Sequence, residues 1–263
     1  MSSLRVSAAG LVPIALACAA SAHDTWVLPG RFDLAAGAKV EASVTSGMRF
    51  PRLESAVAAD RLAVTGLRIA GKTQPLEAAV AGPTALRLSA SPGGTGVAAV
   101  WLATRPRTLS LTPDQVEEYL HEIGASKAVE DRWRQQKRWR ETYSKLAKTF
   151  VRVGEAAGDS SWQQPVGLEL EIVPLDDPTA VRAGRPLRLR VLRSGLPLAG
   201  FAVAAVAAGG RSPVMRTTAG DGTVAFTAGR AGPWLLRGTL IEPSVAPEAD
   251  WQSLFTTLTV LVR

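Results

Sequence analysis

Residues 168–172 read LELEI and residues 187–191 read LRLRV, and these two stretches decide the fold. Apolar residues alternate with charged ones, so each stretch would present one buried and one wet face. This period of two is typical of a β-strand. Turn residues recur at 193–195, 209–210 and 220–222. The region 165–263 therefore predicts about seven short strands, the pattern of an immunoglobulin-like antiparallel β-sandwich.

The first part of the chain also predicts strands. Between residues 26 and 109, short apolar stretches are separated by Gly, Pro and polar turns. Alternation such as Val97-Ala99-Trp101 indicates half-buried strands. We therefore expect an N-terminal β-sandwich over residues 23–158, joined to the C-terminal one by a linker within 154–165. The predicted fold class is mainly β, with two tandem antiparallel β-sandwich domains.

A helical insertion is expected inside the first sandwich, over about residues 112–147. Thr112-Pro113-Asp114-Gln115 has the residues of a capping box with Pro at the first helical position. Apolar residues in 116–123 share one helical face, and Gly124 suits a helix C-terminus. A second, charged helix is expected from about Ala128 to Lys145.

The first 22 residues predict a cleavable signal peptide. A short basic start is followed by an apolar stretch over 6–20 and by Ala20-Ser21-Ala22, a small-x-small ending. A retained membrane anchor is the alternative, but the stretch is short and contains Gly and Pro, whereas a span needs about 20 apolar residues. Lipidation at Cys18 is a further alternative, although the preceding residues match the usual lipid box poorly. The expected product is a periplasmic protein that begins at His23.

Composition and motifs argue against several function classes. Cys18 is the only cysteine and belongs to the leader, so thiolate metal sites and disulfides are excluded from the mature chain. The net charge of +7 is modest, and no nucleic-acid partner is expected for an exported protein. We find no Gly-x-Ser-x-Gly elbow, phosphate loop or dinucleotide fingerprint. Asp176-Asp177 fits a turn better than the spaced carboxylate pair of a polysaccharide hydrolase. The sequence therefore predicts a binding protein and no enzyme.

Histidine 23 is the strongest candidate for a functional residue. As the first residue of a processed chain, it would offer its α-amine and its imidazole to one ion, a chelate suited to Cu(II), Ni(II) or Co(II). Asp24 and His121 are candidates for completing the site. The alternatives are that His23 follows the leader by coincidence and frays, and that His121 is an ordinary surface histidine. Two histidines cannot form a three-histidine zinc site.

Several stretches match one known family, in order over nearly the whole mature chain: AHDTW (22–26), EYL (118–120) with Gly124, RETYSKLAK (140–148), LEIVP (170–174) through Pro178, GLPLAG (195–200), Asp221-Gly222, GPWLL (232–236) and Asp250-Trp251. They resemble DUF4198, secreted bacterial proteins often described as the periplasmic component of cobalt/nickel transport systems. The resemblance implies a β-rich envelope protein with His23 as a metal ligand. Relatives often carry a second histidine near Gly238-Thr239-Leu240, and Leu240 cannot ligate a metal.

The sequence therefore leaves two functions open. The first is a periplasmic metal-binding or metal-delivery protein for nickel, cobalt or copper, which the resemblance connects with an inner-membrane transporter component. The second is a non-catalytic envelope module that docks a protein or membrane partner through the basic, Trp-bearing segment 127–152. That segment also fits a solvated helical face.

Overall fold

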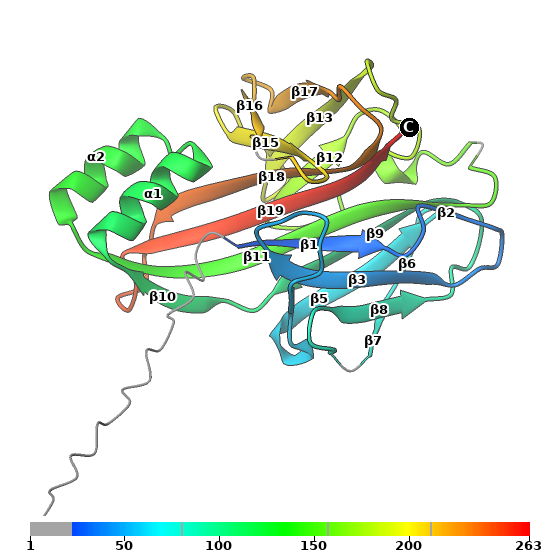
Figure 1. Cartoon of the computed structure of the whole chain (residues 1–263), viewed down its shortest axis with the longest axis horizontal. Helices are drawn as coiled ribbons and strands as arrows, with labels where there is room; N and C mark the ends of the chain where they lie inside the picture. Colours follow the sequence, from blue (N-terminus) through cyan, green and yellow to red (C-terminus); the bar gives the residue numbers. More distant parts are fainter. Residues whose placement is uncertain (1–22, 80, 157, 211) are drawn as a thin grey trace, which may run out of the picture.

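The computed structural model describes residues 23–79, 81–156, 158–210 and 212–263. Strands dominate these residues and form three sheets (Figure 1). The first sheet has the order β1-β3-β8-β7, with β4 paired to β3. Its strands are β1 (Asp24–Pro29), β3 (Val40–Gly47), β8 (Leu86–Ala90), β7 (Glu77–Ala78) and β4 (Ser55–Ala56). The prediction of a mainly β protein is confirmed.

The second sheet has ten strands and runs through the whole molecule. Its order is β16-β15-β18-β19-β11-β9-β5-β6, with β10 and β2 paired to β11. The strands are β16 (Val214–Thr217), β15 (Ala202–Ala207), β18 (Gly232–Pro243), β19 (Trp251–Val262), β11 (Trp139–Val153), β9 (Gly96–Thr104), β5 (Leu62–Ile69), β6 (Lys72–Gln74), β10 (Arg107–Leu111) and β2 (Asp33–Leu34). β11 pairs in parallel with β19 and with β2, whereas the other pairs of described strands are antiparallel.

The third sheet covers the C-terminal half of the second one (Figure 1). It contains β12 (Leu170–Pro174), β13 (Pro186–Arg193), β14 (Leu196–Pro197) and β17 (Thr223–Thr227). The LRLRV stretch lies in β13, where Leu187, Leu189 and Val191 are buried and Arg188 is exposed. The alternation read from the sequence therefore predicts the buried face of β13 correctly. For LELEI the expected wet face is wrong, because Glu171 of β12 is 1% exposed and pairs with the buried Lys148.

Two β-sandwiches result, as expected, and they are built on the shared second sheet. Leu146 and Phe150 of β11 belong to the core under the third sheet, whereas Ala147 and Val151 belong to the core under the first sheet. β9 divides in the same way, since Val97, Ala99 and Trp101 face one core and Ala98, Val100 and Leu102 face the other. The expectation that this strand is half-buried is wrong, because a sheet lies over each of its faces. The division at 158 and 165 into separate domains stays a prediction.

The helical insertion is shorter than expected. α1 (Pro113–Ile123) begins at the predicted capping box of Thr112 and Gln115 and ends at Gly124, whose φ is 62°. α2 (Lys127–Gln136) has Lys137 as its C-terminal cap, and Trp139–Lys145 belong to β11. The helix expected to reach Lys145 is therefore corrected to end at Gln136. In β11 this stretch pairs with β10 on one side and β19 on the other, and tertiary pairing of this kind overrides helix propensity.

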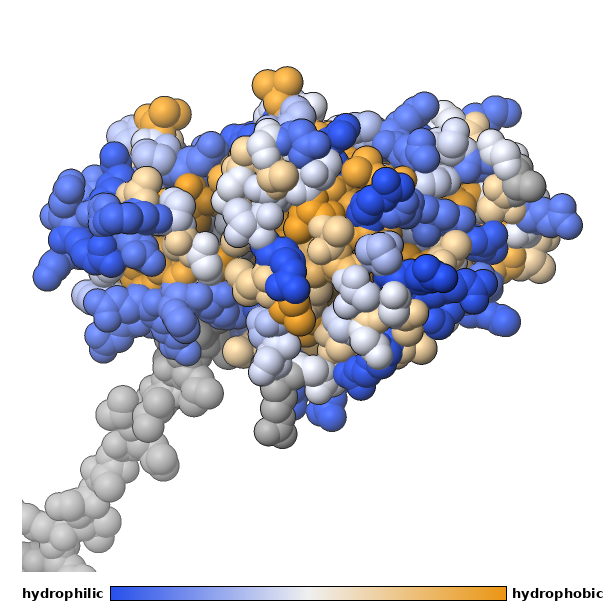
Figure 2. Space-filling view, turned by 90° about the horizontal axis from the view of Figure 1, so that it is seen from above, coloured by the Kyte–Doolittle hydropathy of each residue, from blue (hydrophilic) through white to orange (hydrophobic). Residues whose placement is uncertain are grey.

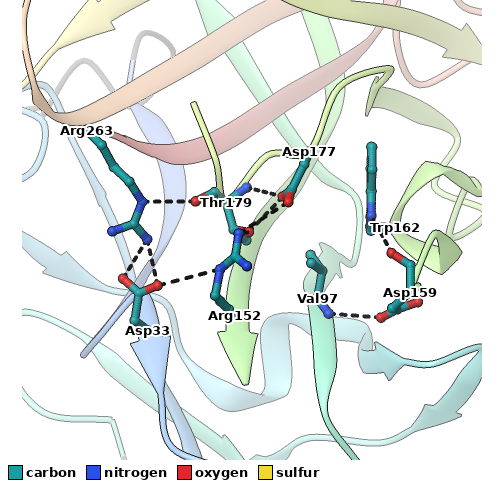
Figure 3. A network of polar contacts seen from close by, with 8 residues as sticks. All are labelled: Asp33, Val97, Arg152, Asp159, Trp162, Asp177, Thr179 and Arg263. Atoms are coloured by element: carbon teal, nitrogen blue, oxygen red, sulfur yellow. Dashed lines mark hydrogen bonds and ion pairs between the residues drawn. The ribbon is translucent and has the colours of Figure 1, made fainter. Parts of the chain in front are cut away.

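The predicted linker packs against the second sheet. Asp159 accepts hydrogen bonds from the backbone N–H groups of Val97 and Ser161, both at 2.9 Å, and the Trp162 indole donates to the Asp159 carbonyl at 2.8 Å (Figure 3). Arg68 of β5 donates to the carbonyls of Ser161 and Pro165 at 3.1 and 2.9 Å. Two short 3-10 helices complete the description, η1 (Ala59–Arg61) and η2 (Ser161–Gln163).

The C-terminal residue is held beside the linker by a chain of ion pairs. Arg263 donates to both carboxylate oxygens of Asp33 at 2.6 Å, and Arg152 lies between Asp33 and Asp177 (Figure 3). Asp177 also accepts from the Thr179 hydroxyl at 2.7 Å. Asp177 thus fits the turn role predicted from the sequence.

Candidate functional site

The structure anchors His23 at the start of β1. Strand β1 packs across β11 and β19, and the Thr25 carbonyl accepts a hydrogen bond from the Thr257 hydroxyl at 2.6 Å. The His23 carbonyl accepts a hydrogen bond from the Lys145 ammonium group of β11. His23 is half-buried as a result. These contacts disagree with the interpretation that this residue frays in solvent. The leader itself, with Cys18, lies outside the described residues.

Asp24, the first residue of β1, pairs with Arg237 of β18. The distance from Arg237 Nη1 to Asp24 Oδ2 is 2.9 Å, and Arg237 also contacts Glu122 of α1 at 3.1 Å. Burial raises the pKa of Asp24 to about 6, although the charge of Arg237 opposes this rise. Asp24 is therefore engaged as the partner of a guanidinium group.

His121 is exposed in the last turn of α1. Its neighbour Glu122 reaches Arg237, so the C-terminal end of α1 faces the start of β1. Within the described ranges, no three His, Cys, Asp or Glu side chains form a group that could hold a metal ion. The structure therefore does not gather His23, Asp24 and His121 into one side-chain cluster, and their roles as ligands stay predictions.

Glu54 is a nearby carboxylate that the sequence did not single out. It accepts from Met48 N at 3.1 Å and from Arg49 Nε at 2.7 Å. Burial disfavours its charged form, but these hydrogen bonds and the charges of Arg49 and His23 lower its pKa. Glu54 lies against Gly47, which is paired with Asp24. A Cβ added at Gly47 would come within 2.7 Å of Glu54 Oε2. Glu54 therefore supplies a carboxylate whose charge reaches His23.

The position expected to carry a second family histidine does not belong to this site. Leu240 of β18 packs against the core of the second sandwich, together with Leu236. Arg237, which meets Asp24, and Ile241, which belongs to the core under the helices, lie on the other face of the strand. Because side chains alternate along a strand, a ligand at position 240 would point away from His23.

The basic segment 127–152 is largely paired within the protein. The ion pairs that it makes are Lys127–Asp131, Arg134–Glu130, Arg134–Asp131, Arg138–Asp250, Arg140–Asp250, Lys148–Glu171, Arg152–Asp33 and Arg152–Asp177. Its tryptophans Trp133 and Trp139 are buried with Tyr119 in the core under the helices. The segment thus offers less free positive charge to an anionic partner than its composition suggests.

An apolar cavity lies in the second sandwich. Its volume is about 290 Å³, and Leu187, Phe226 and Trp234 are in its wall. Arg216 is the single charged residue of that wall. Figure 2 shows apolar residues near the centre of an otherwise mainly hydrophilic face. This cavity holds no carboxylate or imidazole and so differs in kind from the site at β1.

Fold and site together define a mainly β protein, in which two sandwiches share a sheet and polar groups gather where the chain enters β1. The sequence matches a domain of unknown function (DUF4198) over residues 20–241. This match covers most of the chain, and the protein belongs to that family, as the resemblance predicts. No protein of curated function matches the sequence. No helix among the described residues has the length and apolar character that a membrane span requires.

Solved structures of low similarity include two bacterial adhesins and a domain of intimin. A 1.5-MDa ice-binding adhesin is 11% identical over 91% of this chain and 64% of that one, with a TM-score of 0.24. The Escherichia coli adhesin FdeC is 14% identical over 90% and 64%, with a TM-score of 0.24. The D00-D0 domain of intimin is 10% identical over 90% and 99%, with a TM-score of 0.22. The chain thus spans less than two thirds of the first two, and at these TM-scores the likeness bears on neither fold nor function.

Proposed function

We propose that this protein is an exported, non-catalytic binding protein for a divalent transition metal, and that His23 captures the ion. The anchoring of His23 at the start of β1 carries this proposal. A processed terminus at this residue would be fixed by β1 and Lys145, so its donor atoms would be restricted before the ion arrives. Such restriction lowers the entropic cost of binding.

The donor set suits nickel, cobalt and copper. The α-amine and an imidazole nitrogen of His23 would close one chelate ring, and nitrogen donors favour these borderline ions. Glu54 is a carboxylate oxygen donor on which the charge of His23 acts. Asp24 would first have to release Arg237, and His121 is exposed on α1. His23 and Glu54 are therefore the residues that we propose as the centre of the site.

Metal capture at this site would release protons, because an amine and an imidazole must be neutral to coordinate. We therefore expect affinity to fall as the pH is lowered. The ion is cargo in this proposal, and an inner-membrane transporter component is the proposed recipient in the periplasm.

The test uses the exported protein, whose intact mass first establishes whether it begins at His23. Titration calorimetry with Ni(II), Co(II) and Cu(II) then compares this protein with His23→Ala and with a chain that retains Ala22. The extra residue converts the α-amine of His23 into an amide while leaving its imidazole unchanged. We expect both changes to abolish tight binding and His121→Ala to leave it unchanged. Absence of binding by the correctly processed protein would overturn the proposal.

A further inference from the structure

A polar cavity of about 200 Å³ lies beside the start of β1, on the face that carries Thr25. Its wall is formed by β1, β3, β9, β10 and β11 and by the segment from β4 to η1. Three charged residues are in this wall, and all three are cations: Arg61, Arg107 and Lys145. A cavity of this size with charges of one sign is suited to a ligand of the opposite sign.

The three cations lack a partner of opposite charge at close range. Among described residues, no carboxylate oxygen lies within 4.0 Å of a charged nitrogen of Arg61, Arg107 or Lys145, whereas the basic residues of α2 and the start of β11 have such partners. Among described residues, the guanidinium group of Arg61 donates to the Pro106 carbonyl alone, at 3.3 Å. Burial lowers the pKa of Arg61, and the charge of Arg107 lowers it further. The two guanidinium groups therefore lie close enough to repel each other, and an anion between them would relieve that repulsion.

The charge of Asp60, the residue before Arg61, partly opposes the lowering of the Arg61 pKa, whereas the two acids whose charges act on Lys145 are committed elsewhere. Asp24 pairs with Arg237, and Glu141 accepts hydrogen bonds from the Tyr119 hydroxyl at 3.2 Å and the Trp139 indole at 2.6 Å. Lys145 is only 7% exposed, and its ammonium group donates to the His23 carbonyl. An ammonium group has three donors, so Lys145 keeps capacity for a ligand.

We propose that this cavity binds a small organic anion with carboxylate groups, held by Arg61, Arg107 and Lys145. Guanidinium groups bind carboxylates with two parallel hydrogen bonds, which favours this class of ligand. The hydroxyl groups of Thr25, Ser46 and Tyr143 add neutral hydrogen-bonding partners. The stretch 56–58, Ala-Val-Ala, gives an apolar wall for a carbon skeleton. A four-carbon dicarboxylate is a simple ligand of this class, with a short carbon skeleton between two carboxylates, and it serves as the probe below.

The proposal is separate from metal capture, because the cavity wall does not include His23. Its link to that residue is the hydrogen bond from Lys145 to the His23 backbone carbonyl, which His23→Ala keeps. We therefore test it on the full exported protein freed of metal by chelation and gel filtration. Calorimetric titration with succinate, acetate and phosphate is performed at constant ionic strength, so that general screening does not change between probes. We expect saturable binding of succinate, and weaker binding of acetate and of phosphate.

Arg107→Ala is the decisive variant, because the Arg107 side chain makes no hydrogen bond or ion pair with another described residue and the variant keeps the backbone pairing with β11. We expect at least a tenfold loss of succinate affinity in Arg107→Ala. Arg105→Ala is the matched control: it removes the same charge two residues away, outside the cavity wall. His23→Ala should also retain succinate binding, which separates this result from the metal experiment. Equal losses in Arg105→Ala and Arg107→Ala, preferential binding of phosphate, or no saturable binding of succinate would each overturn the proposal.

Discussion

Lys148 Nζ lies 2.6 Å from Glu171 Oε1, and the two side chains are 2% and 1% exposed. The pair joins β11 of the shared sheet to β12 of the third sheet. Glu171 also accepts hydrogen bonds from the backbone N–H groups of Val166, Gly167 and Leu168, at 2.9 to 3.2 Å. This ion pair therefore fixes both the entry to the second sandwich and its position on β11.

Removing Lys148 should destabilise the protein strongly. In Lys148→Met the Glu171 carboxylate would stay buried without its cation, and breaking a buried pair in this way costs about 3–5 kcal/mol. The free energy of unfolding from guanidinium titration measures the loss. The double variant Lys148→Met, Glu171→Leu should lose less than the sum of the two single variants, because it leaves no unpaired buried charge. Strict additivity would show that the two groups do not interact as described.

Asp250 should make the free energy of unfolding depend on pH in the acidic range. It accepts from Arg140 and Arg138, with the shortest contact at 2.7 Å from Arg138 Nη2, and these hydrogen bonds hold its pKa well below the usual range. A lowered pKa in the folded state stabilises the protein above about pH 4 and loses this effect as the pH falls further. We expect Asp250→Asn to destabilise by about 1–2 kcal/mol at pH 7 and by less at pH 3. Asp60→Asn, an exposed carboxylate, is the control in the same denaturation series and should show no such trend.

The sequence predicts which face of a strand is buried better than it predicts which strands lie next to each other. In LRLRV the period of two identifies the buried leucines of β13, because one face of that strand is wet. β9 is different, since both of its faces are covered and Val97 to Leu102 carry almost no polar residue that would mark a face. The sharing of one sheet by two sandwiches depends on pairing between β11 and β19, about a hundred residues apart, and no local pattern reports such a pairing.

The candidate site shows the same limit. His23 can be recognised in the sequence, because it directly follows the predicted leader. Lys145 is hidden, because the charged stretch before it resembles a helix, and only pairing with β10 and β19 makes it part of a strand under His23. Glu54 and Arg237 lie 31 and 214 positions from His23 in the sequence, so only the folded chain brings them near β1.

Arg237 should stabilise the junction of β1, α1 and β18 in a manner that depends on pH. In Arg237→Met, the Asp24 and Glu122 carboxylates would face each other without a cation, and we expect the free energy of unfolding to fall by about 2–4 kcal/mol at pH 7.5.

Burial raises the pKa of Asp24 to about 6, above its ordinary value of 3.8. The folded protein therefore binds a proton here more readily than the unfolded chain, so the contribution of Asp24 to stability increases as the pH falls from above 6 towards 4. The destabilisation by Arg237→Met should consequently be smaller at pH 5 than at pH 7.5, as measured by urea titration. A loss that grows as the pH falls would contradict the pairing.

Glu54 provides the sharpest check on where the metal would bind. Glu54→Gln keeps the size of the side chain and removes its charge, and we expect about a tenfold loss of Ni(II) affinity, the scale on which groups around a ligand act. Glu77→Gln is the matched control, because Glu77 is exposed on β7 and lies in the same sandwich at a distance from β1. Gly47→Ala tests the same carboxylate from the other side: the new Cβ would lie 2.7 Å from Glu54 Oε2 and force the carboxylate to move. Glu54→Gln and Gly47→Ala should both weaken Ni(II) binding measured by calorimetry, although His23 is unchanged in both variants. If Glu54→Gln and Glu77→Gln bind the ion equally well, Glu54 is not part of the site, and the proposed chelate would consist of His23 alone.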